Sequence, residues 1–201
     1  MLFLVDSLTL PSSDQAQYDR LAGLGYSITV KTDTACVAGD ATGKTLVFIS
    51  ESVGGAALGI KMRDVAVPVI DCEGNNFPYM QMTGNTASDY GDYSGYMQVT
   101  VQTPSHPLAG GMSGTLTVYP DGWGEMNTGL PNGNAAKVAY VTGNGTWWAI
   151  FGYDTGAVMF NGYVAQKRRV GLFMRQPSLS HTNSNAWNFF DASVKWAVGD
   201  I

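Results

Sequence analysis

The sequence predicts an α/β fold of three layers, in which helices cover both faces of a mostly parallel sheet. Three observations support this prediction. The chain opens on an apolar run, strand-like and helix-like segments alternate up to residue 76, and a helix with aromatic residues on one face closes the chain. Because parallel strands need crossover connections, this alternation is typical of βαβ units with right-handed crossovers.

The first half of the chain contains the alternating elements. Residues 1–6 are apolar up to Asp6, as expected for a strand that is buried on both faces. A serine cap and an acid at 11–14 begin a helix, and Gly25 ends it. The following elements are expected in this order: a strand at 26–33, a short helix or turn at 34–43, a strand at 45–50, a helix at 54–64 that Ser52 caps, and a strand at 65–72.

The composition of the chain changes after residue 76. We interpret residues 77–135, rich in Gly, Asn, Tyr, Pro and Met, as a loop-rich insertion in a single domain of residues 1–201. Further strands are expected at 96–103, 114–120, 136–143, 147–153 and 168–175. A final helix over 184–198 places Trp187, Phe190, Val194 and Ala197 on one face, and Gly199 ends it. The order as a whole predicts a flavodoxin-like sandwich with a β-rich, loop-rich second half.

Composition and charge exclude several classes of function. Charged residues make up 13% of the chain, about half the share of roughly 25% in an average domain. The net charge is −5, and the basic cluster 167–169 is interpreted as the solvated flank of a strand, so nucleic-acid binding is not expected. The sequence has no apolar run long enough for a membrane span and no recognisable signal peptide. A surface low in charge favours an extracellular module or a subunit of a virion-type assembly, and a cytoplasmic location stays open.

Polar residues follow the predicted parallel strands, where ligand crevices of such sheets lie. The strand ends read Asp6-Ser7, Ser50-Glu51-Ser52 and Asp71-Cys72-Glu73-Gly74-Asn75-Asn76. The predicted binding residues are Ser50, Ser52, Glu73, Asn75, Asn76 and, in the loop-rich segment, Tyr90 and Tyr93. No cofactor and no metal are predicted, since the chain has two histidines and its loop acids lack a calcium-loop spacing. Cys36 and Cys72 are expected to be buried, reduced thiols.

Several segments together resemble the ThuA-like branch of the class I glutamine amidotransferase-like fold, of the kind appended to large secreted bacterial proteins. These segments are VPVIDCEG, SHPLAGGMSG, AAKVAYVTGNGTWWAIFGYDTG and AWNFFDASVKWAVG. The resemblance covers nearly the whole chain and rests on the order of the segments. Catalytic members of the wider fold carry a cysteine within G-x-C-x-G and a distant His-x-Glu. Counted from Pro68, that cysteine slot falls on Glu73 here, and no His-x-Glu follows. The resemblance therefore implies the fold far more than amidotransferase chemistry.

Two functions are compatible with these residues. The first is a non-catalytic binding or structural module whose partner is a glycan or the protein subunits of a larger assembly, with a homo-oligomer left open. The alternative is a hydrolase or carbohydrate-active enzyme in which Glu73 works with Asp71 or Glu51, because two neighbouring carboxylates can perform acid–base chemistry. A filled crevice would favour the module, and a deep pocket with convergent polar groups would favour the enzyme.

Overall fold

The computed structural model describes residues 1–176 and 178–200. Its helices are α1 (Ser12–Gly23), α2 (Gly55–Leu58) and α3 (Ser184–Val198), with short 3₁₀ turns η1 (Ala38–Ala41), η2 (Gly74–Asn76), η3 (Pro107–Ala109), η4 (Phe160–Gly162) and η5 (Ser178–His181). The strands are β1 (Leu2–Val5), β2 (Thr29–Thr32), β3 (Val47–Ile49), β4 (Val69–Asp71), β5 (Tyr90–Ser94), β6 (Gln98–Val101), β7 (Gly114–Thr117), β8 (Glu125–Gly129), β9 (Ala136–Val141), β10 (Trp148–Tyr153) and β11 (Arg169–Leu172).

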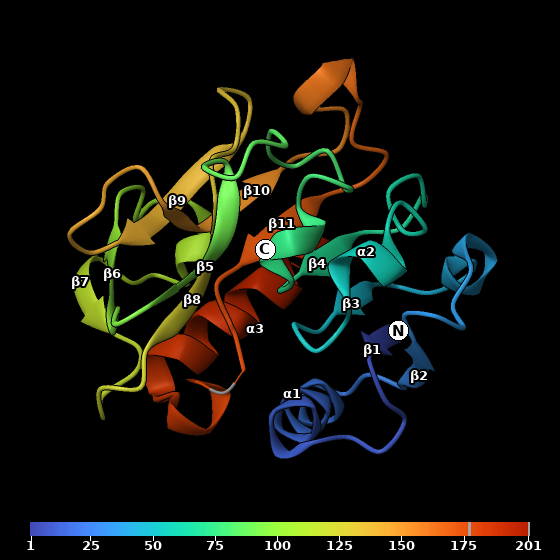
Figure 1. The fold of residues 1–201 in the computed structure, drawn as a ribbon, viewed down its shortest axis with the longest axis horizontal. Helices are drawn as coiled ribbons and strands as arrows, with labels where there is room; N and C mark the ends of the chain where they lie inside the picture. Colours follow the sequence, from blue (N-terminus) through green and yellow to red (C-terminus); the bar gives the residue numbers. More distant parts are fainter. Residues whose placement is uncertain (177, 201) are drawn as a thin grey trace.

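The strands of the described residues form one mixed sheet. Its order is β2-β1-β3-β4-β11-β10-β9-β6-β7, which Figure 1 shows from right to left, and β5 pairs with β8 in a ribbon that meets β10. The pairings from β2 to β11 are parallel, whereas those that involve β5 to β10 are antiparallel. The prediction of a mostly parallel sheet is therefore wrong for the second half. There, short turns such as the one between β9 and β10 join neighbouring strands, and a short turn can only give antiparallel pairing.

The first half contains less helix than predicted. Helix α2 ends at Leu58 instead of continuing to residue 64, because Gly59 adopts φ 56° and the chain continues in turns. Ser52 does not cap α2, whose N-cap is Gly54, and the Ser52 hydroxyl accepts a hydrogen bond from the Asp6 N–H instead. The expected serine cap of α1 is also wrong, since the N-cap is Pro11 with no side-chain hydrogen bond.

Two apolar layers pack on opposite faces of the sheet. On one face, the rings of Phe3 and Phe48 lie 5.7 Å apart, and Phe48 contacts Phe190 of α3 at 5.2 Å. Helix α1 lies beside α3 on this side (Figure 1), where the Arg20 guanidinium pairs with the Asp191 carboxylate. The other face is covered by the α2 region and the segment after η2, whose side chains form a second core cluster. The fold is therefore layered on both faces, with few helices.

Helix α3 agrees with its prediction in length and in its apolar face. Phe190, Val194 and Ala197 are buried, Trp187 is half-buried, and Gly199 ends the helix at φ 89°. Neighbouring positions, among them Phe189 and Trp196, are buried as well, so the apolar face is wider than the predicted stripe. Since a wide apolar face needs a wide partner surface, α3 packs across the centre of the sheet, against β4 and β11.

The basic cluster 167–169 contains one residue that contradicts its predicted solvated role. Arg169 is fully buried, and its guanidinium donates hydrogen bonds to the backbone carbonyls of Val65 at 2.8 Å, Val67 at 2.9 Å and Arg63 at 3.1 Å. Lys167 is exposed, as expected. Arg169 therefore links β11 to the chain that leads into β4.

Both cysteines are buried and free, which confirms their predicted state. No helix among the described residues combines the length and the apolar character that a membrane crossing requires.

Candidate functional site

The carboxyl ends of β3, β4 and β11 meet at one edge of the sheet, since these strands are parallel neighbours. Ser50 and Glu51 directly follow β3, Glu73 lies just after β4, and Arg175 lies just after β11. The structure thus brings three of the predicted residues to one edge. It also adds an arginine that the sequence did not assign to the site.

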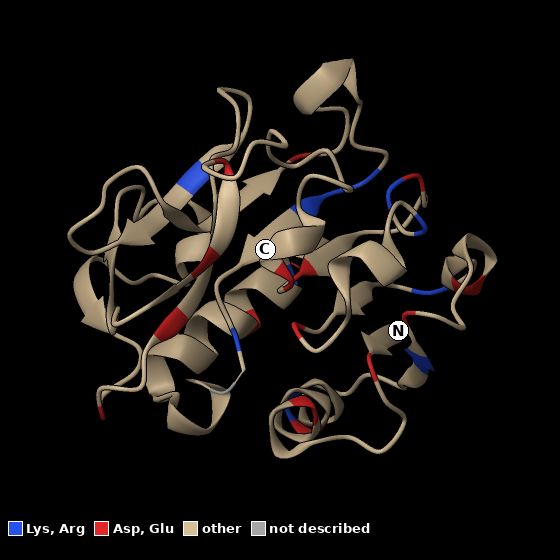
Figure 2. Cartoon of the chain, viewed as in Figure 1, with Lys and Arg blue, Asp and Glu red and all other residues tan. Residues whose placement is uncertain are grey.

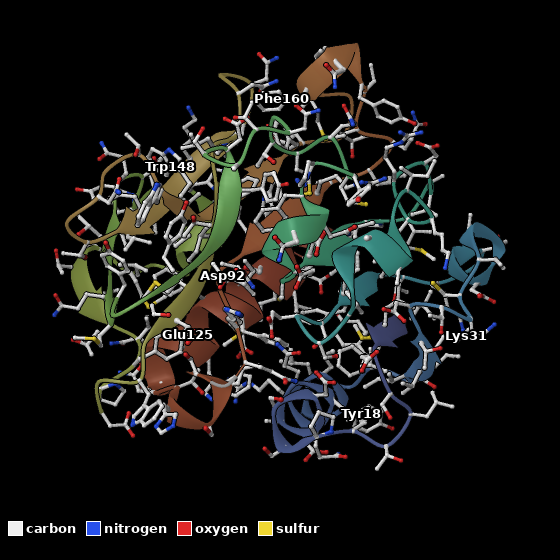
Figure 3. All side chains as sticks on the ribbon, in the orientation of Figure 1. Tyr18, Lys31, Asp92, Glu125, Trp148 and Phe160 are labelled. Atoms are coloured by element: carbon white, nitrogen blue, oxygen red, sulfur yellow. The ribbon has the colours of Figure 1, made fainter. Side chains whose placement is uncertain are left out.

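Arg175 is the centre of this edge. Its Nη1 lies 2.9 Å from Glu51 Oε1, its Nη2 lies 3.0 Å from Asp92 Oδ2, and its Nε lies 3.3 Å from Glu125 Oε2. The backbone N–H of Gln176 donates to the second oxygen of Glu51 at 2.9 Å. Asp92 and Glu125 belong to the β5–β8 ribbon, where Figure 2 shows acidic residues on both strands and Figure 3 labels the two side chains. One arginine therefore ties the parallel half of the sheet to the ribbon.

Carboxylates outnumber cations in this cluster, which we define as Arg175 with Glu51, Glu73, Asp92 and Glu125. The three glutamates are the only ones in the chain. Burial raises the pKa of Glu51 from its usual 4.5 to about 7; the Gln176 N–H and Arg175 oppose this rise, and Glu73 adds to it. Burial also raises the pKa of Glu73. Glu51 is therefore a carboxyl group that titrates near neutral pH.

Glu73 and Asp71 mainly organise the turn after β4. The Glu73 carboxylate accepts a hydrogen bond from the Asn75 N–H at 2.8 Å and so caps η2. Asp71 is fully buried and accepts bonds from the Glu73 N–H at 2.9 Å and from Asn76 Nδ2 at 2.7 Å. Burial raises the pKa of Asp71 well above its usual value. These bonds hold both side chains against their own turn.

Cys72 lies between these two acids and is fully buried. Burial raises the pKa of the Cys72 thiol well above its usual value, and Asp71 and Glu51 raise it further. A nucleophilic cysteine needs the thiolate form and access to substrate. Cys72 therefore has neither property of a nucleophile.

Ser50 faces the interior of the domain. Its hydroxyl donates to the Asp14 carboxylate of α1, and both residues are fully buried. The second carboxylate oxygen of Asp14 and both amide atoms of Gln17 are buried without a hydrogen-bond partner among the described residues. This polar cluster lies under the strand-end edge and connects to it through Gln176, whose Nε2 is 3.4 Å from Asp14 Oδ1.

The other predicted site residues are dispersed. Asn75 is exposed next to Glu73, whereas Asn76 is buried and holds Asp71. Tyr90 is half-buried and lines a separate cavity. The Tyr93 ring stacks on Trp147 with ring centroids 3.6 Å apart. The two tyrosines therefore do not belong to the cluster around Arg175.

Sequence reasoning missed Arg175, Asp92 and Glu125. Arg175 had one signal, its position at the end of a predicted strand next to the other strand ends. Asp92 and Glu125 had none, because β5 and β8 were not predicted. Within the residues that the structure describes, no group of three or more His, Cys, Asp or Glu side chains is placed to hold a metal ion. Five surface cavities, between 350 and 740 Å³, are lined by residues outside the Arg175 cluster.

A search of solved structures finds proteins of similar fold. A ThuA-like protein from Bacteroides uniformis gives a TM-score of 0.61 at 7% identity, covering 98% of this chain and 90% of that protein. A protein from Thermoplasma acidophilum, assigned to GMP synthase, gives 0.58 at 13% identity, with 97% and 94% covered. A glutamine amidotransferase from Thermotoga maritima gives 0.51 at 13% identity, with 99% and 83% covered.

The chain has the class I glutamine amidotransferase-like fold. This confirms the resemblance that the order of segments predicted. Neither a family model nor a curated protein matches the sequence. The shared fold does not transfer an activity at these identities. In this amidotransferase-like domain, the turn after β4 carries Glu73 in the slot that the resemblance assigns to the nucleophile.

Proposed function

We propose that this amidotransferase-like domain is a non-catalytic binding module. The observation that carries the proposal is the position of Arg175. Its side chain occupies the edge where the parallel strands end, and carboxylates from three separate elements hold it there. A substrate would have to displace these ion pairs to reach Glu51, and removing a partner from a partly buried pair is costly. The crevice is therefore filled by the chain itself.

The turn after β4 supports the same proposal. Glu73 is engaged with the backbone of η2, and Cys72 is fully buried. Neither residue is arranged as a nucleophile with an adjacent base. Recognition would then use other parts of the surface.

We further propose that the module acts outside the cell and that its partner is a glycan or a protein subunit. The charged fraction of 13% supports this placement, since the surface relies on Gly, Ser, Thr and Asn for its polarity. The proposal of a virion-type assembly rests on this composition alone. The similar structures are described as a ThuA-like protein, a GMP synthase subunit and a glutamine amidotransferase, and these descriptions name neither a location nor a glycan.

A second candidate is an enzyme that uses carboxylates, and one observation favours it. The pKa of Glu51 is raised to about 7, close to the value that suits a general acid or base at neutral pH. Glu73 lies close enough to raise that pKa further. In this case Glu51 and Glu73 would form the catalytic pair, and Arg175 would have to move aside for substrate. The fully buried Asp71 would serve only to hold the turn.

Hydrolysis assays separate the two candidates. Wild-type protein, Glu51→Gln and Glu73→Gln would be incubated with chromogenic glycosides, chromogenic esters and glutamine across mildly acidic to mildly alkaline pH. Asp64→Asn is the matched control, since Asp64 is exposed and its ion pair is with the neighbouring Arg63. The binding module predicts rates equal to the buffer rate for all four proteins. Turnover that either glutamine variant abolishes and Asp64→Asn preserves would establish the enzyme instead.

A further inference from the structure

A cavity of about 370 Å³ lies away from the Arg175 cluster, between three segments that are distant in sequence. Its walls come from the turn after α2, the segment 78–90 and the excursion around η4. In Figure 1 this excursion extends beyond the sheet close to the segment that follows η2, and Figure 3 labels its Phe160. The volume falls within the range of about 300–1,000 Å³ that is typical of small-molecule sites.

The lining of this cavity is neutral. Its polar side chains and rings are Tyr79, Gln81, Thr83, Asn85, Tyr90 and Asn161. None of the lining residues is an acid or a base that is charged at neutral pH. Ile60 and Tyr79 are large apolar side chains that also line it and are 53% and 39% exposed. Apolar surface combined with a few amide and hydroxyl groups is the usual make-up of a ligand site.

Two lining residues have an unusual backbone. Gln81 and Asn161 adopt φ 59° and 52°, and they are the only residues other than glycine with positive φ in the described chain. Their side chains contact each other, since Asn161 Nδ2 donates to Gln81 Oε1 at 2.6 Å. A glutamine in this conformation is uncommon. Residues in such conformations persist only where the surrounding structure holds them, and they are found most often at active sites and ligand-binding sites. The two described residues other than glycine with positive φ thus line the same cavity.

The surrounding hydrogen bonds make the cavity preformed. The Phe160 N–H donates to the Gln81 carbonyl at 3.0 Å, which joins the excursion to the segment after η2. On the other side, Asn132 and Asn134 donate to the Val158 carbonyl at 3.0 and 2.8 Å. The Tyr153 hydroxyl donates to the Met82 carbonyl at 2.8 Å. A site whose walls are already fixed loses less conformational freedom when a ligand binds.

We propose that this cavity binds one unit of a neutral saccharide. Amide groups both donate and accept hydrogen bonds, as the hydroxyls of a sugar do, whereas a phosphate or an amine would require an opposite charge that the lining lacks. The bond to Gln81 uses one N–H of the Asn161 amide, and its remaining polar groups are available to a ligand. Tyr79 supplies an aromatic face for the apolar side of the sugar ring. This inference rests on the proposed binding function and names its ligand class and its place.

The test is a binding titration of the full chain with a panel of neutral mono- and disaccharides, followed by calorimetry. Asn161→Gly removes the amide at a backbone conformation that glycine adopts freely, so the fold is retained. Tyr79→Ala removes an exposed ring. We expect each variant to weaken binding about tenfold or more, the loss associated with one good contact. Trp123→Ala is the matched control, since Trp123 is 66% exposed outside this cavity, and it should bind like wild type.

Several outcomes would overturn the inference. These are the absence of millimolar binding to every neutral sugar of the panel, binding that both cavity variants retain, and a preference for acidic over neutral sugars. Self-association that Tyr79→Ala abolishes would assign the cavity to a second copy of the chain and would also overturn it. Saccharide binding that is sensitive only to Trp123→Ala would preserve the binding function but refute this site. The hydrolysis assays test the binding function separately, so the two failures are distinguishable.

Discussion

Replacing Arg169 with methionine should strongly destabilise the domain. The side chain is fully buried, and its guanidinium donates to the carbonyls of Val65 and Val67 in the buried part of the chain that leads into β4. Burial lowers the pKa of Arg169 to about 10, so the group stays charged at neutral pH. Methionine keeps much of the length and apolar volume but has no donor. The change therefore isolates the hydrogen bonds from the packing.

The expected loss in the free energy of unfolding follows from the two buried carbonyls that would lose their donor. Leaving a buried acceptor without a partner costs about 1–3 kcal/mol, which gives about 2–6 kcal/mol for the pair. Removing the buried charge offsets part of this loss in stability, since a desolvated cation is itself unfavourable. We expect a net loss of about 3 kcal/mol in the free energy of unfolding, against a total of about 5–15 kcal/mol for a typical domain.

Urea denaturation followed by circular dichroism measures this loss. With a slope of about 1–3 kcal/mol per molar urea, the midpoint should fall by about 1 M or more. Lys167→Met is the matched control, because Lys167 lies two residues away and is exposed. The free energy of unfolding of Lys167→Met, calculated from its urea midpoint, should differ from that of wild type by no more than about 0.5 kcal/mol. If Arg169→Met unfolds at the same urea concentration as Lys167→Met, the buried bonds do not carry the stability assigned to them.

Three further predictions follow from the core and from the Arg175 cluster. Phe190→Ala should cost about 3–5 kcal/mol and lower the melting temperature, whereas Asn188→Ala, on the exposed side of α3, should not; equal melting temperatures would mean that the helix is peripheral. Because the folded-state pKa of Glu51 is raised from 4.5 to about 7, its contribution to stability is present below pH 4.5 and is lost as the pH rises through 7. Glu51→Gln should therefore flatten the fall in urea midpoint over that range, and identical slopes for variant and wild type would contradict the assignment. Cys72 should react with a thiol reagent at neutral pH only after unfolding, since it is fully buried and its pKa is raised; rapid labelling of native protein at Cys72, located by peptide mass mapping, would refute this.

The sequence correctly predicted the elements in which the spacing of apolar residues reflects which face is buried. Helix α3 has apolar residues at helical spacing and Gly199 at its end, and the structure ends the helix at this glycine. Its N-cap is Asn183, which the prediction did not name. The segment after Gly54 misled the prediction, because Leu58 and Met62 have helical spacing and are both buried. The chain turns at Gly59 between them, so the two side chains reach the core from different turns.

The strand-end edge of the site was predictable, but its contents were not. Parallel strands place Glu51 and Glu73 at one edge whatever the details of the loops. Asp92 reaches Arg175 from β5, whose sequence Tyr-Gly-Asp-Tyr-Ser shows no apolar alternation and depends on pairing with β8. The contact between Gln81 and Asn161 spans 80 residues. Such long-range pairs depend on tertiary packing, and a single sequence carries no local signal for them.

The position of β11 has a consequence for the order in which the molecule can be assembled during translation. It lies between β4 and β10 in the sheet, yet it is the last strand in the chain. Both of its neighbours leave the ribosome before it. The edge of β4 that faces β11 has no other strand to pair with, and the corresponding edge of β10 is open except where Trp148 pairs with β8. About 100 residues separate the end of β4 from the end of β11, which at about 5–20 residues per second corresponds to roughly 5–20 seconds of synthesis. During that interval the nascent chain exposes two open strand edges, which are prone to pair with other chains. A ribosome-bound intermediate that lacks residues 169–172 should therefore need protection by chaperones, although the other ten strands of the described residues have already been made.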